Sequence, residues 1–251
     1  MPIPQTIPFR PFNFALLFPL LFVIQGWDAD ARMASGRMEE DRIGVCRPEG
    51  KGPYPTVIYN HGLVVDMFGI GGAAQHGYNL DGICRALAAD GFLTFTPIRR
   101  SGRRDIPAHK EEVSQAVDYV KRQPDVDLSR IALMGFSRGA LLTLMVGVER
   151  SDLKALLILA PAPGGKGDFR ETVKSVPLVN APVLLLVEAG DGTDILENYD
   201  MLDQALRAHG KEVRGILYNR GGGHRLFYDV NYYWEDVRAF LREKLGGLPG
   251  R

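Results

Sequence analysis

A serine flanked by glycines two positions away on each side is the feature of this chain that most directly indicates chemistry. Residues 135–139 read Gly-Phe-Ser-Arg-Gly, with Ser137 at the centre, between apolar runs at 131–134 and 140–146. We expect the first run to be a strand and the second a buried helix. A serine at a tight strand-to-helix turn is a nucleophile elbow, where the turn strains the serine backbone and exposes its hydroxyl. The pattern therefore predicts that Ser137 is a nucleophile.

A serine hydroxyl needs a base to take its proton, so a histidine has to lie beside it in the fold. Where a nucleophile elbow occurs, an acid and then a histidine follow the serine in the chain, and only His209 and His224 do so here. His209 stands at the end of a helical pattern, just before Gly210, where a histidine favours the helix dipole. His224 follows an expected strand at 216–218 through a run of glycines. A loop just past a strand end suits a base, so we predict His224.

The acid is expected in the loop after the preceding strand. The continuous apolar run at 182–187 is typical of a parallel strand covered on both faces, and acidic residues follow it. We choose Asp191, because glycines on either side let the chain turn and present its carboxylate to the base. Its role is to hold the imidazole tautomer and stabilise the imidazolium without taking a proton. Asp194 and Glu188 remain alternatives, each of which is otherwise a solvated carboxylate or a helix cap.

An oxyanion formed at the substrate carbonyl needs hydrogen-bond donors. The backbone N–H of Arg138 directly follows the nucleophile at a helix start and is one natural donor. The second is expected after an earlier strand at 56–60, which runs into a His-Gly step. The N–H of Leu63 is our candidate there. We interpret His61 as a structural hydrogen-bonding residue, because it precedes the serine in the chain.

These motifs together resemble those of α/β-hydrolases in the dienelactone-hydrolase and prolyl-oligopeptidase-like group. The matching pieces are residues 55–62, residues 127–139, the Asp191 loop and Gly223-His224. They span about residues 42–245, and the resemblance implies an α/β-hydrolase fold. The chain departs from the group at two positions. Dienelactone hydrolases proper resemble it but carry a cysteine nucleophile, so Ser137 argues against that narrow activity, and Ala140 replaces a second glycine that many relatives have after the elbow.

The rest of the chain alternates between apolar strand patterns and amphipathic helix patterns. Expected strands lie at 56–60, 92–95, 131–134, 155–159 and 182–187, and expected helices lie within 73–90 and at 109–123, 198–209 and 232–245. Alternation of this kind predicts an α/β fold with a mainly parallel sheet and helices on both faces. Ligands then bind beyond the carboxyl ends of the strands. The short interval at 164–181 predicts little or no cap, with the site walled by a loop at 63–80 and by the region after His224.

The resulting hypothesis is a serine hydrolase that cleaves carboxylic esters of small molecules through an acyl-enzyme on Ser137. The alternatives are a serine peptidase or amidase of the same fold, and a non-catalytic binding protein that retains it. No metal or cofactor is expected. The apolar residues Met67, Phe68, Phe136 and Phe227, with Tyr228, are candidates to line a substrate pocket, although ordinary packing is the first interpretation of each.

Composition narrows the remaining possibilities. The 251 residues carry 30 Lys plus Arg and 30 Asp plus Glu, so no global charge points to nucleic acid as a partner. Cys46 and Cys84 have no metal-ligand spacing, and we interpret them as buried free thiols. The glycine-rich run at 69–74 imitates a dinucleotide loop but does not directly follow a strand. The basic run at 99–104 is interpreted as a solvated loop, with anion binding as the alternative.

The N-terminal segment bears on the compartment. Residues 12–24 are mostly apolar, Arg10 precedes them, and Ala29-Asp30-Ala31 offers a small-residue cleavage pattern. We interpret residues 1–31 as an export signal and residues 32–251 as the hydrolase domain. A secreted or periplasmic protein is therefore expected. The alternatives are an uncleaved membrane anchor at the N-terminus, or a cytoplasmic protein with a mis-assigned start codon.

Overall fold

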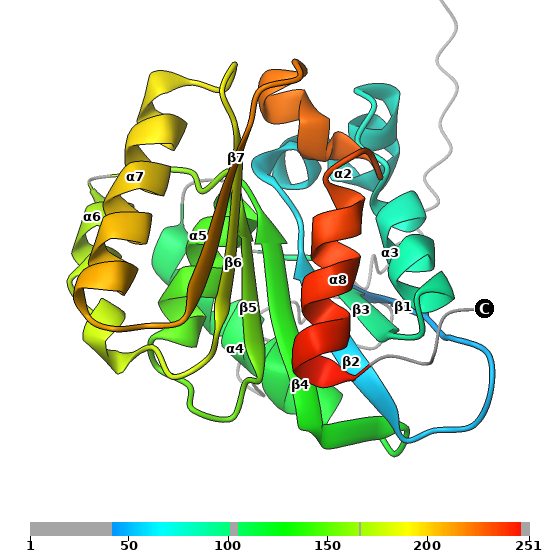
Figure 1. Ribbon diagram of the computed structural model, residues 1–251. Helices are drawn as coiled ribbons and strands as arrows, with labels where there is room; N and C mark the ends of the chain where they lie inside the picture. Colours follow the sequence, from blue (N-terminus) through cyan, green and yellow to red (C-terminus); the bar gives the residue numbers. More distant parts are fainter. Residues whose placement is uncertain (1–41, 101–104, 166, 247–251) are drawn as a thin grey trace, which may run out of the picture. The chain divides into compact units, whose positions relative to one another are not determined.

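The computed structural model describes residues 42–100, 105–165 and 167–246. Its centre is a seven-stranded sheet in the order β1-β3-β2-β4-β5-β6-β7 (Figure 1). The strands are β1 Ile43–Cys46, β2 Tyr54–Asn60, β3 Leu93–Pro97, β4 Val126–Phe136, β5 Ala155–Leu159, β6 Val183–Glu188 and β7 Val213–Tyr218. Only β1 runs antiparallel to its neighbour, and every other pair is parallel. The predicted mainly parallel sheet is confirmed.

Helices connect the strands and cover both faces of this sheet (Figure 1). They are α2 Leu63–Gln75, α3 Leu80–Ala89, α4 Ile106–Lys121, α5 Arg138–Gly147, α6 Asp168–Val173, α7 Thr193–Ala208 and α8 Trp234–Leu245, with 3-10 turns η3 Val176–Leu178 and η4 Gly223–Tyr228. Apolar residues of α4, α5, α6 and α7 pack on one face of the sheet, and those of α3 and α8 pack on the other. This arrangement is the one that right-handed crossovers between parallel strands produce.

The two hydrophobic cores follow from the alternation of side chains along each strand. In β2, Ile58 belongs to the core under α4 and α5, whereas its neighbours Val57 and Tyr59 belong to the core under α3 and α8. All three side chains are completely buried. Because both faces of the sheet are covered, the central strands are continuous apolar runs, and this is why they are recognisable in the sequence.

Helix α2 corrects the expectation of a loop at 63–80. Its sequence is apolar on all sides and contains three glycines, so it shows no amphipathic period. Gly69 breaks the helical geometry with φ 68° and ψ 177°, which bends the segment. Its first turn nevertheless begins directly after Gly62, at the carboxyl end of β2. The segment that carries the Leu63 N–H is therefore a helix N-terminus.

Cys46 and Cys84 form a disulfide that joins the edge strand β1 to helix α3, with 5.7 Å between their Cα atoms. The interpretation of two free thiols is therefore wrong. Sequence spacing gave no signal for this bond, because the residues are 38 positions apart and meet only when β1 pairs with β3 beside α3. The disulfide lies at the edge of the sheet, and β3 and β2 separate β1 from β4.

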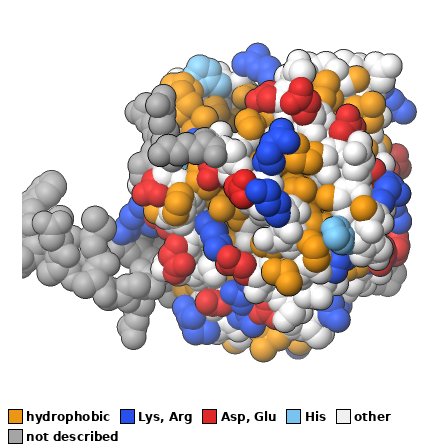
Figure 2. Space-filling model, turned by 90° about the vertical axis from the view of Figure 1, so that its left-hand side faces the viewer, with side chains coloured by type: hydrophobic (Ala, Val, Ile, Leu, Met, Phe, Trp, Pro, Cys, Tyr) orange, Lys and Arg blue, Asp and Glu red, His pale blue; other side chains and the backbone are white. Residues whose placement is uncertain are grey.

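The surface over α6 and α7 carries both signs of charge. Figure 2 shows this side of the molecule, where acidic, basic and apolar side chains are interspersed and neither charge gathers. Among the described residues, no helix combines the length and apolar character needed to cross a membrane. The expected export signal at residues 1–31 lies outside the described residues.

Candidate active site

Ser137 occupies the junction between β4 and α5, in a backbone conformation that confirms the predicted strain. Its φ of 55° and ψ of −116° are unusual for a residue with a side chain. A Cβ atom on Gly135 would stand 2.2 Å from the carbonyl oxygen of Gly139, and one on Gly139 would stand 2.0 Å from that of Asn60. Both positions therefore require glycine, because the elbow turns tightly between its own helix and the end of β2.

His224 and Asp191 complete a chain of hydrogen bonds to this serine. The Nε2 atom of His224 lies 2.9 Å from the Ser137 Oγ atom. The Nδ1 atom of His224 lies 2.9 and 3.0 Å from the two carboxylate oxygens of Asp191. With the ring proton on Nδ1 directed at Asp191, Nε2 is free to accept the serine proton. Three residues that are far apart in the chain thus meet at the carboxyl ends of β4, β6 and β7.

The acid and the base of this hydrogen-bond chain differ in burial. The Asp191 side chain is only 2% exposed, whereas that of His224 is 32% exposed. The imidazole therefore faces the solvent side, while its carboxylate partner is protected behind it. The Phe136 ring packs against the His224 ring with 4.7 Å between their centroids.

The alternative acids and base lie elsewhere. Asp194 is exposed in the first turn of α7, and its carboxylate accepts the backbone N–H of Ile195. Glu188 is buried, but its carboxylate is fully engaged by backbone N–H groups. His209 is an exposed residue at the C-cap of α7, as the sequence indicates. Only Asp191 of the three carboxylates contacts His224.

Both backbone donors proposed for an oxyanion stand at helix N-termini. Arg138 is the first residue of α5 and Leu63 is the first residue of α2, so neither N–H has an acceptor in the preceding turn of its own helix. The Gly62–Leu63 segment lies against the nucleophile, because a Cβ atom on Gly62 would stand 3.6 Å from that of Ser137. The N–H of Gly62 itself donates to the Tyr78 hydroxyl at 3.3 Å.

A buried ionic cluster stabilises the Gly62–Leu63 segment. The Arg99 guanidinium donates to both carboxylate oxygens of Asp66, at 3.1 and 2.8 Å, and to the carbonyl oxygen of His61 at 2.8 Å. The side chains of Arg99 and Asp66 are each 2% exposed. Burial, and after it the Arg99 charge, hold the pKa of His61 well below its usual value, so its imidazole is neutral. His61 is thus structural, as expected.

Arg99 itself requires a correction. The sequence places it in a solvated basic loop, whereas the structure buries it against α2 because Asp66 supplies a partner for its charge. Arg100, the next residue, is exposed, and residues 101–104 of the basic run lie outside the described residues.

The predicted substrate-lining residues divide into two groups. Met67 and Phe68 are 39% and 48% exposed on α2, where a ligand is able to reach them. Phe136 and Phe227 are 1% and 0% exposed. The two rings pack beneath the His224 loop with 6.0 Å between their centroids, in line with the packing interpretation.

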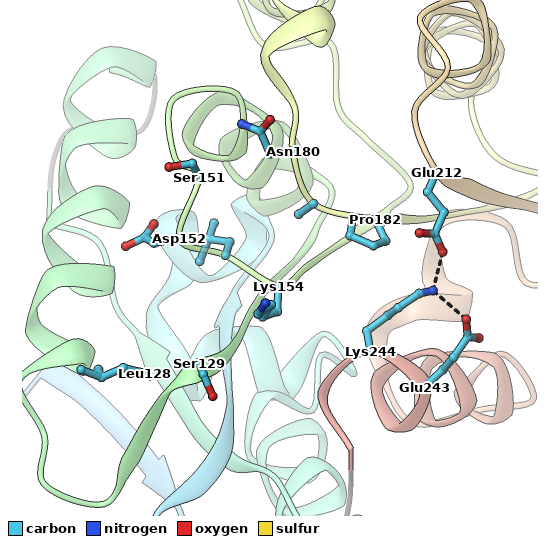
Figure 3. Close-up of a pocket in the computed structure, with 12 residues that line it drawn as sticks. Leu128, Ser129, Ser151, Asp152, Lys154, Asn180, Pro182, Glu212, Glu243 and Lys244 are labelled. Atoms are coloured by element: carbon cyan, nitrogen blue, oxygen red, sulfur yellow. Dashed lines mark hydrogen bonds and ion pairs between the residues drawn. The ribbon is translucent and has the colours of Figure 1, made fainter.

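A pocket of about 600 Å³ lies at the opposite edge of the sheet (Figure 3). Its walls come from the amino-terminal ends of β4 to β7 and from the end of α8. Lys244 bridges Glu212 and Glu243 on one wall. This pocket is remote from Ser137, which stands at the carboxyl end of β4, and it takes no part in the candidate site.

The BD-FAE family model matches residues 45–164. Acyl-coenzyme A thioesterase 1 of Mus musculus is 25% identical, in an alignment that covers 73% of this chain and 51% of that protein. The chain spans about half the length of the curated relatives it matches.

Solved structures share the same arrangement of strands and helices. A structure titled "Putative Dienelactone Hydrolase" from Klebsiella pneumoniae has a TM-score of 0.62 at 22% identity, covering 81% of this chain and 91% of that one. A hyperthermophilic esterase from Pyrobaculum calidifontis has a TM-score of 0.62 at 16% identity, covering 81% and 80%. The fold is therefore that of the α/β-hydrolases. The likeness to these solved structures is one of fold, and the sequence motifs resemble those of the dienelactone-hydrolase and prolyl-oligopeptidase-like group.

Proposed function

We propose that the chain is a serine hydrolase that cleaves carboxylic esters through an acyl-enzyme on Ser137. The observation that carries this proposal is the continuous hydrogen-bond chain from Ser137 through His224 to Asp191. It stands at the carboxyl ends of the parallel strands, which is where α/β sheets bind ligands. The similarity to esterases in fold supports the same reading.

In the first half of the reaction, the Ser137 Oγ atom attacks the ester carbonyl carbon while His224 Nε2 takes the hydroxyl proton. Asp191 stabilises the imidazolium that forms and remains ionised itself. The carbonyl oxygen becomes an oxyanion, which accepts hydrogen bonds from the backbone N–H groups of Leu63 and Arg138. Both donors stand at helix N-termini, where the helix dipole favours negative charge.

In the second half, the tetrahedral intermediate collapses and the bond between the carbonyl carbon and the alcohol oxygen breaks. His224 returns its proton to the leaving alcohol, and the acyl group stays on Ser137. Water then attacks the acyl carbon while His224 takes a proton from it. The second tetrahedral intermediate collapses as the bond between the acyl carbon and the Ser137 Oγ atom breaks, and His224 returns the proton to that oxygen. The products are the free acid and a regenerated serine, so the cycle requires no metal or cofactor.

Met67 and Phe68 on α2 are the candidates for contact with the apolar part of the substrate, because they are exposed on the helix that begins at the oxyanion donor.

A thioester is the second candidate substrate class. It is favoured by the similarity to the mouse acyl-coenzyme A thioesterase, which covers 73% of this chain. The acyl transfer to Ser137 is the same for either leaving group.

A panel of substrates tests the proposal. Purified protein is assayed with p-nitrophenyl esters of increasing acyl length, with acyl-coenzyme A thioesters of the same lengths, and with aminoacyl p-nitroanilides, each beside the Ser137→Ala variant. Serine-dependent turnover of the oxygen esters supports the proposal. Faster turnover of the thioesters would make the protein a thioesterase. Turnover of the anilides alone would make it a peptidase. If none of the substrates is turned over in a way that depends on Ser137, a non-catalytic binding protein is favoured.

We also propose that the protein is exported to a secreted or periplasmic location. The Cys46–Cys84 disulfide supports this, because such bonds persist in oxidising compartments. Sequencing the N-terminus of mature protein from its native host tests the cleavage of residues 1–31. A mature chain that begins after about Ala31 supports export with cleavage, and one that begins at Met1 contradicts it.

A further inference from the structure

One buried carboxylate connects the loop that carries Asp191 to the loop that carries His224. Glu188, the last residue of β6, is 1% exposed. Its Oε2 atom accepts the N–H of Gly190 at 2.6 Å and that of Gly223 at 3.0 Å. Its Oε1 atom accepts the N–H of Gly221 at 2.9 Å and that of Arg220 at 3.2 Å. Four backbone donors from two loops therefore converge on a single side chain.

The glycines of the second loop make this convergence possible. Gly221, Gly222 and Gly223 have φ values of 86°, 109° and 51°, in a region that only glycine adopts freely. Residues in this conformation turn their N–H groups toward a common point, which forms an anion-binding concavity. A Cβ atom on Gly223 would also stand 2.7 Å from the carbonyl oxygen of Gly190. The close approach of the two loops therefore depends on glycine.

The charge of Glu188 is satisfied by the backbone. Among the described residues, the structure gives this carboxylate no ion-pair partner, and its side-chain oxygens are hydrogen-bonded only to N–H groups. Burial alone raises the pKa of a carboxyl group, but the four N–H bonds together outweigh burial and leave the pKa of Glu188 below its usual value. Glu188 is therefore ionised at neutral pH and acts as an acceptor at both oxygens.

The Glu188 contact lies directly beside the proposed acid and base. Gly223 directly precedes His224, and Gly190 directly precedes Asp191. A movement of one loop relative to the other would change the distance between the imidazole and its carboxylate, and with it the approach of Nε2 to Ser137. We propose that Glu188 is a positioning residue, which fastens the His224 loop to the Asp191 loop and thereby sets the geometry of the proton-transfer chain. This inference rests on the proposed function, and it names the part that holds that site together.

Glu188→Gln is the most direct test, because glutamine keeps the size and removes one acceptor. Whichever way the amide turns, its NH₂ group replaces an oxygen that accepts two N–H bonds, so two backbone donors face another donor. Glu188→Asp keeps the charge but shortens the side chain, and it serves as the conservative variant. Asp194→Asn is the matched control, since it neutralises an exposed carboxylate just beyond the same loop.

Two readouts are measured on each folded protein. The first is amide hydrogen exchange at residues 190, 220, 221 and 223, which requires no activity, with Leu185 in the sheet as the internal reference. The second is the separation of kcat from KM on a p-nitrophenyl ester. We expect Glu188→Gln to raise exchange at these amides by at least about 10-fold, with Leu185 unchanged. We also expect kcat to fall on the order of 10-fold to 100-fold at nearly constant KM, as a misplaced base predicts. Glu188→Asp should lie between wild type and Glu188→Gln in both measurements.

The outcomes separate this inference from the proposed function. Unchanged exchange at the four amides in Glu188→Gln overturns the fastening role. Faster exchange with an unchanged kcat overturns the link to proton transfer, while wild-type turnover shows that the proposed function stands. If wild type reacts with neither ester nor fluorophosphonate, the proposed function fails, and the exchange data alone then decide whether Glu188 fastens the loops.

Discussion

At the scale of single residues, the site depends on few side chains that the sequence identifies well. Ser137 is recognisable because two glycines and a strand-to-helix transition surround it, and His224 because few histidines follow it. Asp191 is harder to identify from the sequence, because three carboxylates stand close together in one loop. Burial and contact favour Asp191, because its side chain is 2% exposed and hydrogen-bonded to His224.

The nucleophile and base are predicted to act as one unit. Ser137→Ala and His224→Ala should each lower kcat by several orders of magnitude, because either change interrupts the same proton transfer. The double variant should therefore be little worse than either single variant. Steady-state kinetics on one ester, with circular dichroism to verify folding, measure this. Losses that multiply in the double variant would contradict a shared mechanism.

Asp191 is predicted to matter far more than the neighbouring acid. Asp191→Asn should lower kcat by about 10⁴, because the imidazole is then free to adopt the wrong tautomer. Asp194→Asn should keep most activity, since its carboxylate is exposed and accepts the N–H of Ile195 in the first turn of α7. Both variants are compared at neutral pH with their melting temperatures. If Asp194→Asn is the inactive one, the assignment of the acid moves along the loop.

At the scale of elements, loops and helix ends hold the reacting groups in place. The sequence predicts the buried strands and the helices α4, α5, α7 and α8, because their patterns are continuous or amphipathic. The sequence predicts a loop where α2 lies, because its glycines and mostly apolar character hide a helical period. Its role depends on Asp66, an acidic residue in an otherwise apolar run. That isolated charge indicates a need for a partner, but the local sequence does not identify which residue supplies it.

Arg99 is predicted to stabilise the oxyanion segment through α2. Arg99→Lys keeps a positive charge but cannot donate to Asp66 and the His61 carbonyl in the same bidentate way. We expect kcat to fall by up to about 10², the lower end of the cost of losing an oxyanion donor, with KM nearly unchanged. Arg100→Met, at the exposed neighbouring position, is the control. Equal kcat values for the two variants, at similar melting temperatures, would refute this role.

The contact of Glu188 with the two loops should depend on pH in a defined direction. Its pKa in the folded state lies below the unfolded value of about 4.3, because four N–H bonds favour the charged form. Its stabilisation is then complete above about pH 4.3 and is lost as pH falls through the lower folded pKa. Arg220, Tyr232, Asp191 and His224 are the other titratable groups around this contact.

The measurement is the protection of the Gly221 and Gly223 amides against hydrogen exchange, corrected for intrinsic rates. Protection should be the same at pH 7 and pH 5 and should fall only in the acid range below that. Burial, and after it the Glu188 charge, raise the pKa of Tyr232, so this phenol stays neutral throughout. Loss of protection already between pH 7 and pH 5 would mean that another group controls the loop.

At the scale of the whole molecule, one sheet separates two hydrophobic cores and presents the site at its carboxyl edge. The sequence predicts this architecture because alternating strand and helix patterns permit few topologies. It could not predict the Cys46–Cys84 bond, the burial of Arg99 or the four bonds of Glu188. Each of these depends on two segments that meet only after the sheet has formed, and no local pattern encodes such contacts.

The disulfide is predicted to stabilise the fold without affecting the chemistry. It closes a loop of 38 residues, for which the chain-entropy estimate is about 4 kcal/mol as an upper value. Replacing both cysteines with serine should therefore lower the melting temperature clearly, while kcat at 25 °C stays within about twofold. Calorimetry under oxidising and reducing conditions measures the first effect. A large loss of kcat in folded variant would show that the edge of the sheet influences the site.

The central claim is that Ser137 is a nucleophile activated by His224. The most direct measurement is reaction of folded wild-type protein with a fluorophosphonate, followed by intact-mass determination and peptide mapping. We predict a single adduct on the peptide that contains Ser137, no adduct in Ser137→Ala, and labelling slowed by at least about 10²-fold in His224→Ala. Absence of labelling in wild type, or an adduct on a different residue, would contradict the account.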